Sequence, residues 1–192
     1  MAGAVRRRGA LVGVLMALVA GLLTGCGDDR PYNETDVMFL QMLSPHHREG
    51  LEIVRLAGDR TLRPEVRRLV DAIATTQREE LTRMTRWLST WGEPATAPPG
   101  AHAGHGGMPG TTEAEMKAVA ATPDAAFERA FLQVLLAHQD DAIQIARLEL
   151  KSGDHRDVRD FARRVEQSRT SQVRMMSGWL EPVSRGGPSP SG

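Results

Sequence analysis

Two types of metal-binding side chain lie close together near residue 45. Met42 and His46 are four residues apart, and His47 follows directly. A helix would place the thioether and the imidazole one turn apart on the same face. That face also carries apolar residues, so these groups are expected inside a helical protein or at its mouth. The combination suits copper, because a thioether selects Cu(I) and an imidazole accepts Cu(I) or Cu(II).

The same pattern recurs later in the chain. Residues 39–46, FLQMLSPH, align with residues 131–138, FLQVLLAH, at an offset of 92, and that offset also pairs Met84 with Met176. A gapless register over roughly fifty residues predicts a duplicated helical hairpin. His138 therefore takes the position of His46, and Met84 and Met176 take equivalent positions on the second helix of each hairpin. Gln77, Glu80 and Gln172 add polar atoms on neighbouring turns.

The elements that must position these residues are helices. Apolar residues recur at helical spacing through hairpins 35–91 and 111–181, and the Gly- and Pro-rich segment 92–110 cannot continue a helix. Asn33 or Thr35 can cap the first helix, and Thr111 or Thr112 with Glu115 resembles a capping box that opens a short helix. The prediction is an all-α fold, a ferritin-like four-helix bundle of two repeated hairpins with a long crossover linker.

Three further candidate ligands lie in the linker, where His102, His105 and Met108 stand among glycines. They could capture a metal ion on a flexible chain, or the segment could be a Gly-rich spacer with incidental histidines. His155 falls between the third and fourth long helices and is expected to be exposed to solvent.

The N-terminus reads as an export signal. Three arginines at 6–8 precede an apolar run over 10–23, and the sequence LTGC ends at Cys26, the single cysteine of the chain. This resembles a bacterial lipobox, which predicts a signal peptide over 1–26, lipidation of Cys26 and a tether over 27–34. The alternative is an uncleaved membrane anchor. The expected location is the extracytoplasmic face of the cell membrane, and residues 182–192 are predicted to be a disordered tail.

Composition and missing motifs exclude several function classes. The chain has 24 basic and 24 acidic residues, so nucleic acid is not an expected partner. One cysteine excludes an internal disulfide and a Cys-rich zinc site. No glutamate lies three residues before a histidine, as di-iron bundles require, and the zincin motif is absent. We therefore expect a protein that is not an enzyme.

The motifs as a set resemble those of the DUF305 family of exported, ferritin-like proteins, in its actinobacterial duplicated form. The resemblance rests on residues 36–47 (DxxFLxMxxPHH), 77–88 (QxxELxxMxxWL) and 104–110 (GHGGMPG), and it spans about 35–180. It implies binding of copper or silver outside the cytoplasm. This chain departs from the family pattern in its second half, where His138-Gln139 replaces a second His-His pair.

The leading hypothesis from the sequence is a lipid-anchored protein that buffers or carries copper or silver. His46, His47 and Met42 would bind the ion with His138, Met84 and Met176 as secondary ligands, and a copper-handling protein is a candidate partner. One alternative is a metal-free interaction scaffold, in which the His/Met face packs against a partner or a second copy. Another is a ferritin-like redox enzyme.

Overall fold

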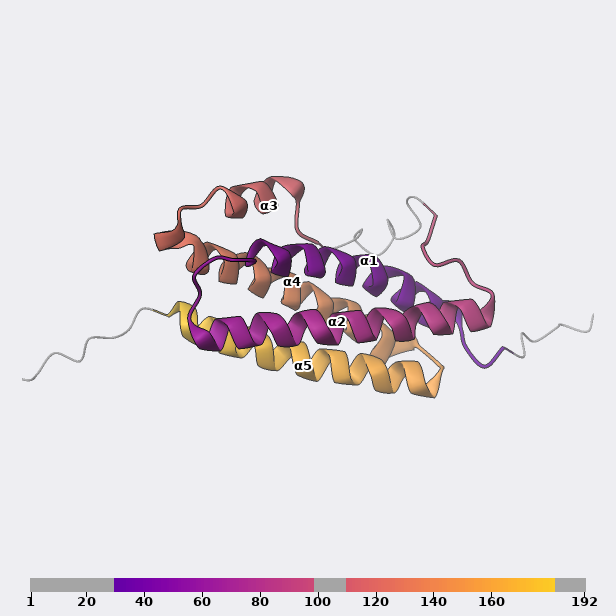
Figure 1. The fold of residues 1–192 in the computed structure, drawn as a ribbon. Helices are drawn as coiled ribbons and strands as arrows, with labels where there is room; N and C mark the ends of the chain where they lie inside the picture. The colour runs from indigo at the N-terminus through magenta and orange to yellow at the C-terminus, as the bar shows by residue number, and fades with distance from the viewer. Residues whose placement is uncertain (1–29, 99–109, 182–192) are drawn as a thin grey trace, which may run out of the picture.

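The computed structural model describes residues 30–98 and 110–181, which form five helices (Figure 1). The helices are α1 (Glu34–Leu56), α2 (Pro64–Trp91), α3 (Glu113–Ala120), α4 (Asp124–Ser152) and α5 (Arg156–Leu180). The predictions on residues 1–26, Cys26, the linker residues His102, His105 and Met108, and the tail 182–192 lie outside the described residues. Within the described residues the all-α fold is confirmed, and α1–α2 and α4–α5 are the two predicted hairpins.

Local sequence signals set the helix ends. Asn33 caps α1 in a capping box with Asp36, and Pro64 opens α2, where its missing N–H costs no hydrogen bond. Thr112 caps α3 in a second capping box with Glu115, as predicted. Gly92 ends α2 in the left-handed region at φ 70°, which glycine adopts without steric cost. The helix boundaries therefore follow from capping and turn chemistry.

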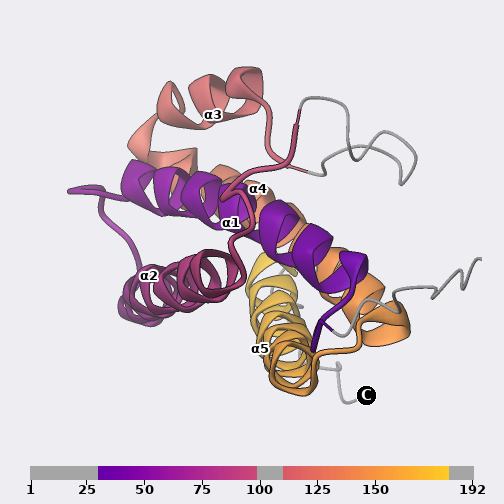
Figure 2. The ribbon, with the colours of Figure 1, turned by 90° about the vertical axis from the view of Figure 1, so that its right-hand side faces the viewer.

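The four long helices form the bundle and α3 lies outside it. α1 packs along α2 and α4, and α4 packs along α5. Viewed from the end, α3 sits beyond α1 and α4, on the side away from α2 and α5 (Figure 2). Among the described helices, none combines the length and apolar content needed to cross a membrane.

Asp36 joins the two hairpins at one end of the bundle. Its buried carboxylate accepts hydrogen bonds from the backbone N–H groups of Asn33, Asp154 and His155, so it bonds the starts of both α1 and α5. His155 is half-buried rather than exposed, because its ring accepts from Val158 N to cap α5 and contacts two tryptophan rings of α2, Trp87 and Trp91. The expectation of an exposed loop histidine was wrong for this reason.

Candidate metal centre

A layer of polar side chains crosses the middle of the bundle. It separates one apolar cluster around Phe39 and Phe161 from another around Ile53 and Phe131. We call this the central polar layer, and none of its members is more than 8% exposed: His46 and His47 of α1, Gln77 of α2, His138 and Gln139 of α4, and Arg169 and Gln172 of α5. Burying so many polar groups without full hydrogen bonding is costly, so the layer is a candidate functional site.

The rings of His46 and His138 stack at the centre of this layer. Their centroids are 3.8 Å apart and their planes differ by 13°. Both nitrogens of His46 and Nε2 of His138 have no hydrogen-bond partner. Burial, reinforced by the nearby His138, His47 and Arg169, holds the pKa of His46 well below its ordinary value. His46 is therefore a neutral imidazole with an unpaired lone pair, which is the form that binds metal ions.

His47 is held in a single tautomer by Glu80. Its Nε2 lies 2.6 Å from Glu80 Oε2, and burial lowers the pKa of His47 to about 4. A neutral His47 must donate Nε2–H to the carboxylate, which leaves a lone pair on Nδ1, and that atom is buried without a partner. A carboxylate bonded to one imidazole nitrogen is the usual way proteins orient a histidine whose other nitrogen binds a metal.

Arg169 places a positive charge in the layer that the sequence did not lead us to expect. Its side chain is fully buried, its Nη2 donates to Glu80, and the same Nη2 lies 3.4 Å from His47 Nε2. Burial acts to raise the pKa of Glu80, but the hydrogen bond from His47 and the charge of Arg169 outweigh it and lower that pKa. Glu80 is therefore an ionised carboxylate shared between an imidazole and a guanidinium.

Gly50 makes room for the layer. A side chain at this position would place its first carbon 2.5 Å from Gln77 Oε1 and 2.7 Å from His138 Nε2. The amide of Gln77 has no hydrogen-bond partner at either atom. The missing side chain at residue 50 thus lets α1 approach the unpaired atoms of both neighbours.

The edge of the layer reaches the surface beside His138. Nδ1 of His138 lies 3.4 Å from Thr111 Oγ1 and 3.5 Å from Glu49 Oε1. Glu49 also accepts from the backbone N–H of Thr111, and these contacts lower the pKa of its carboxyl despite partial burial. Glu49 was not among the residues predicted from the sequence.

The predicted methionine ligands flank the layer on both sides. Met42 and Met84 are buried in the cluster around Phe39, where Ser44 Oγ donates to Met84 Sδ at 3.7 Å. Met176 is buried in the other cluster, around Phe131. The structure therefore brings the three predicted histidines into one layer and divides the methionines between its two sides.

No three His, Cys, Asp or Glu side chains in residues 30–98 and 110–181 converge in a way that could hold a metal ion. A centre in this layer would thus combine at most two such groups with thioether or amide donors. The chemistry of the buried donors fits a soft ion, because neutral imidazoles and thioethers are the ligands that Cu(I) prefers.

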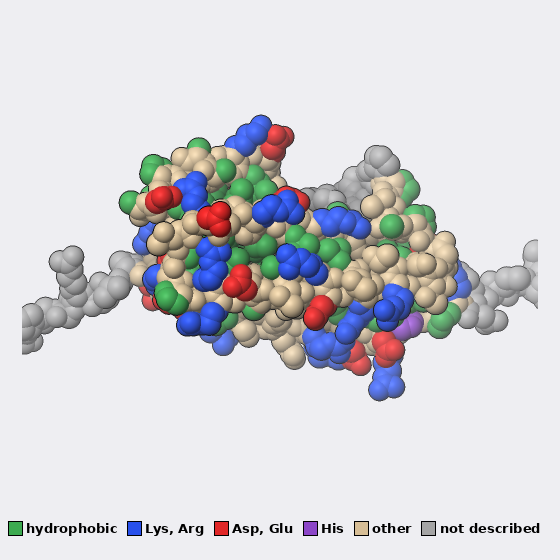
Figure 3. Space-filling view, viewed as in Figure 1, with side chains coloured by type: hydrophobic (Ala, Val, Ile, Leu, Met, Phe, Trp, Pro, Cys, Tyr) green, Lys and Arg blue, Asp and Glu red, His purple; other side chains and the backbone are tan. Residues whose placement is uncertain are grey.

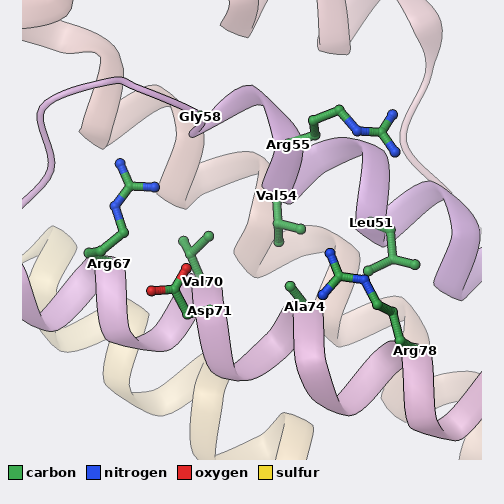
Figure 4. Close-up of a pocket in the computed structure, with 9 residues that line it drawn as sticks. All are labelled: Leu51, Val54, Arg55, Gly58, Arg67, Val70, Asp71, Ala74 and Arg78. Carbon is green, nitrogen blue, oxygen red and sulfur yellow. The ribbon is translucent and has the colours of Figure 1, made fainter.

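A surface groove of about 270 Å³ lies between α1 and α2 (Figure 4). Its apolar lining comes from Leu51, Val54, Val70 and Ala74, and the basic side chains around it are Arg55, Arg67 and Arg78. The same mixture of apolar and basic surface is visible between these helices in Figure 3. The lining contains no histidine or methionine, so the groove contributes no ligands of the predicted type.

The comparisons with known proteins agree with this architecture. A family model described as "Domain of unknown function (DUF305)" matches residues 36–180. A DUF305 protein from Streptomyces coelicolor, described as secreted, superposes with a TM-score of 0.70 at 31% identity, covering 76% of this chain and 91% of that one. A DUF305 fragment from Deinococcus radiodurans gives 0.67 at 27% identity, covering 79% and 98%.

CopM in its Cu(II)-bound form shares the fold, with a TM-score of 0.64 at 24% identity over 76% of this chain and 95% of that one. No curated protein matches the chain. The family model covers most of the described helices, and the Streptomyces structure agrees with it in both fold and sequence. The chain therefore belongs to the DUF305 family.

Proposed function

We propose that this protein binds copper or silver ions in the central polar layer and acts as a buffer or carrier rather than as a catalyst. The observation that carries the proposal is the stacked, buried pair His46 and His138, in which both nitrogens of His46 and Nε2 of His138 have no protein partner. Buried polar atoms without partners are costly, and a bound metal ion would satisfy them. In this proposal the metal ion is what the protein carries, and it is not a resident cofactor.

The ligands fall into two groups. At most two of the three nitrogen donors, His46, His138 and Nδ1 of His47, would bind one ion. The thioethers that flank these donors are Met42 and Met84 on one side of the layer and Met176 on the other. Glu80 orients His47 without binding the ion. A soft monovalent ion suits this set better than a hard one, because thioether sulfur is a soft ligand.

Proteins with the same fold support the proposed type of ligand. CopM, which shares the fold at 20–24% identity, has been solved in Cu(I)-, Cu(II)- and Ag-bound forms. The Streptomyces relative is described as secreted, which agrees with export through the signal sequence that we propose for residues 1–26. We propose that Cys26 is lipidated and holds the bundle at the extracytoplasmic face of the membrane, where the ion is passed to a copper-handling partner.

The test is a competition titration with Ag(I) and, without oxygen, Cu(I). The full-length chain is used in detergent with Cys26→Ser, so that no thiol competes for the ion. The double variant His46→Ala/His47→Ala and the single variant His138→Ala are expected to weaken binding, the former by at least about 100-fold. His155→Asn is the matched control, because asparagine preserves the cap of α5. Unchanged affinity in the double variant would overturn the site assignment.

A further inference from the structure

Arg169 is a buried cation next to the proposed ligands. Its guanidinium is fully buried, it bonds Glu80, and its Nη2 lies 3.4 Å from Nε2 of His47. The negative charge of Glu80 is therefore already balanced by a protein group. For an ion that enters the layer, the repulsion from Arg169 therefore offsets the attraction to Glu80.

The repeat shows that this charge is not required by the backbone frame. Arg169 is equivalent to Gln77, and Glu80 is equivalent to Gln172, at the offset of 92 residues. At these two core-facing positions each half thus carries one glutamine and one charged residue. The glutamine of one half stands at the position of the charged residue in the other half. A glutamine is therefore accommodated at each of the two positions in one half of the fold. This indicates that the charges can be replaced by amides while the fold is kept.

The repulsion between Arg169 and a bound ion scales with the charge of the ion. A divalent ion meets twice the repulsion that a monovalent ion meets at the same place, and screening by salt is weak because the layer is buried. The guanidinium already acts on both imidazoles, since its charge contributes to lowering the pKa values of His46 and His47. Glu49 and Asp141 lie near His138, and both residues are unchanged in every variant considered below.

We propose that Arg169 makes the central polar layer selective for monovalent soft cations, Cu(I) and Ag(I), over divalent cations such as Zn(II) and Cu(II). This inference rests on the proposed function and specifies the charge of the ions that the layer binds. Arg169 is a selectivity-determining residue that acts through its charge, without binding the ion itself.

The experiment measures the dissociation constants of Ag(I) and Zn(II), two redox-inert probes, on the full-length Cys26→Ser chain. The readout is the ratio of the Zn(II) constant to the Ag(I) constant. Arg169→Gln installs the residue of the equivalent position and is expected to lower this ratio by about tenfold or more, because it frees the charge of Glu80. Arg169→Lys keeps the charge and is expected to keep most of the discrimination.

Two further variants control for folding and for net charge. Arg169→Gln/Glu80→Gln removes both charges together and leaves no unpaired buried charge, and it is expected to raise the ratio again relative to Arg169→Gln. Arg163→Gln removes a half-exposed arginine of the same helix and is expected to leave the ratio unchanged. All variants retain the linker histidines, so differences in the ratio report on the layer.

The outcomes separate the two proposals. If the parent chain binds no Ag(I), both the proposed function and this inference fail. If Ag(I) binds and Arg169→Gln leaves the ratio unchanged, or Arg169→Lys lowers it as far as Arg169→Gln does, only the inference fails.

Discussion

The two hairpins share one backbone frame but carry different chemistry at its centre. In the first hairpin His47 is hydrogen-bonded to Glu80, and at the equivalent positions of the second Gln139 donates to Gln172. The hydrogen bond between the paired helices is thus kept in both halves. Only the first half, however, leaves an imidazole nitrogen free, because the atom of Gln139 without a partner is its amide oxygen, Oε1.

The difference teaches that duplication fixed the positions of the polar layer but not its function. His46 and His138 are the one pair of equivalent layer residues that remained histidine in both halves, and they stack on each other. Around them, the first half supplies the anion Glu80 and the second half supplies the cation Arg169. The halves have therefore become complementary, and each depends on the other for charge balance.

The largest expected effect comes from breaking this charge balance. Glu80→Ala leaves the guanidinium of Arg169 buried without its anion and should destabilise the fold by about 3–5 kcal/mol. The equivalent change in the other half, Gln172→Ala, removes a neutral hydrogen bond and should cost about 1–2 kcal/mol. Urea unfolding followed by circular dichroism measures both. Equal losses would show that the two pairs are energetically alike and that the halves are not complementary.

A second difference lies at the far end of the hairpins, where Ala57 of the first half is equivalent to Glu149 of the second. Glu149 is fully buried, and burial together with the neighbouring Asp36 carboxylate raises its pKa to about 9. In the unfolded chain this carboxyl loses its proton near pH 4.5. Between pH 4.5 and pH 9 the folded state therefore binds one more proton than the unfolded state. Stability should therefore fall as the pH rises through this window.

Glu149→Gln removes the titration and should flatten this slope. We expect the variant to gain about 2 kcal/mol relative to the parent chain between pH 6 and pH 8, as measured by unfolding at each pH. Glu52→Gln, on an exposed side chain of α1, is the control. An unchanged slope in Glu149→Gln would mean that this carboxyl does not hold its proton in the folded state.

The fold could be predicted from the sequence because its signals are local and repeated. Helical spacing of apolar residues gave the two hairpins, and the capping residues Asn33 and Thr112 gave helix starts within a residue or two. The repeat also placed His46 and His138 at equivalent positions, which predicted that they belong to one site. Both inferences rest on periodicity, which can be read directly from the sequence.

The partners of these histidines could not be predicted in the same way. Arg169 lies on an arginine-rich helix, where a further arginine is expected to face solvent. The one signal in the sequence was its equivalence to Gln77, a polar residue at a core-facing position. Glu49 contacts His138 through tertiary packing between α1 and α4, and no spacing encodes that contact. Met84 and Met176 were grouped because they are equivalent, yet equivalence under a two-fold repeat places them on opposite sides of the layer.

The smallest expected effect concerns Gly50 and its equivalent, Ala142. In a helix interior alanine is more favourable than glycine by about 1 kcal/mol, so Ala142→Gly should destabilise the fold by at least that amount, because a buried methyl group is also lost. Gly50→Ala should not return the same gain, because the new methyl group would press on the amide of Gln77 and on Nε2 of His138. Urea unfolding of the two variants compares them directly. A stabilisation of about 1 kcal/mol by Gly50→Ala would mean that Gln77 and His138 move aside freely, and that the packing of α1 against these two residues does not require a glycine.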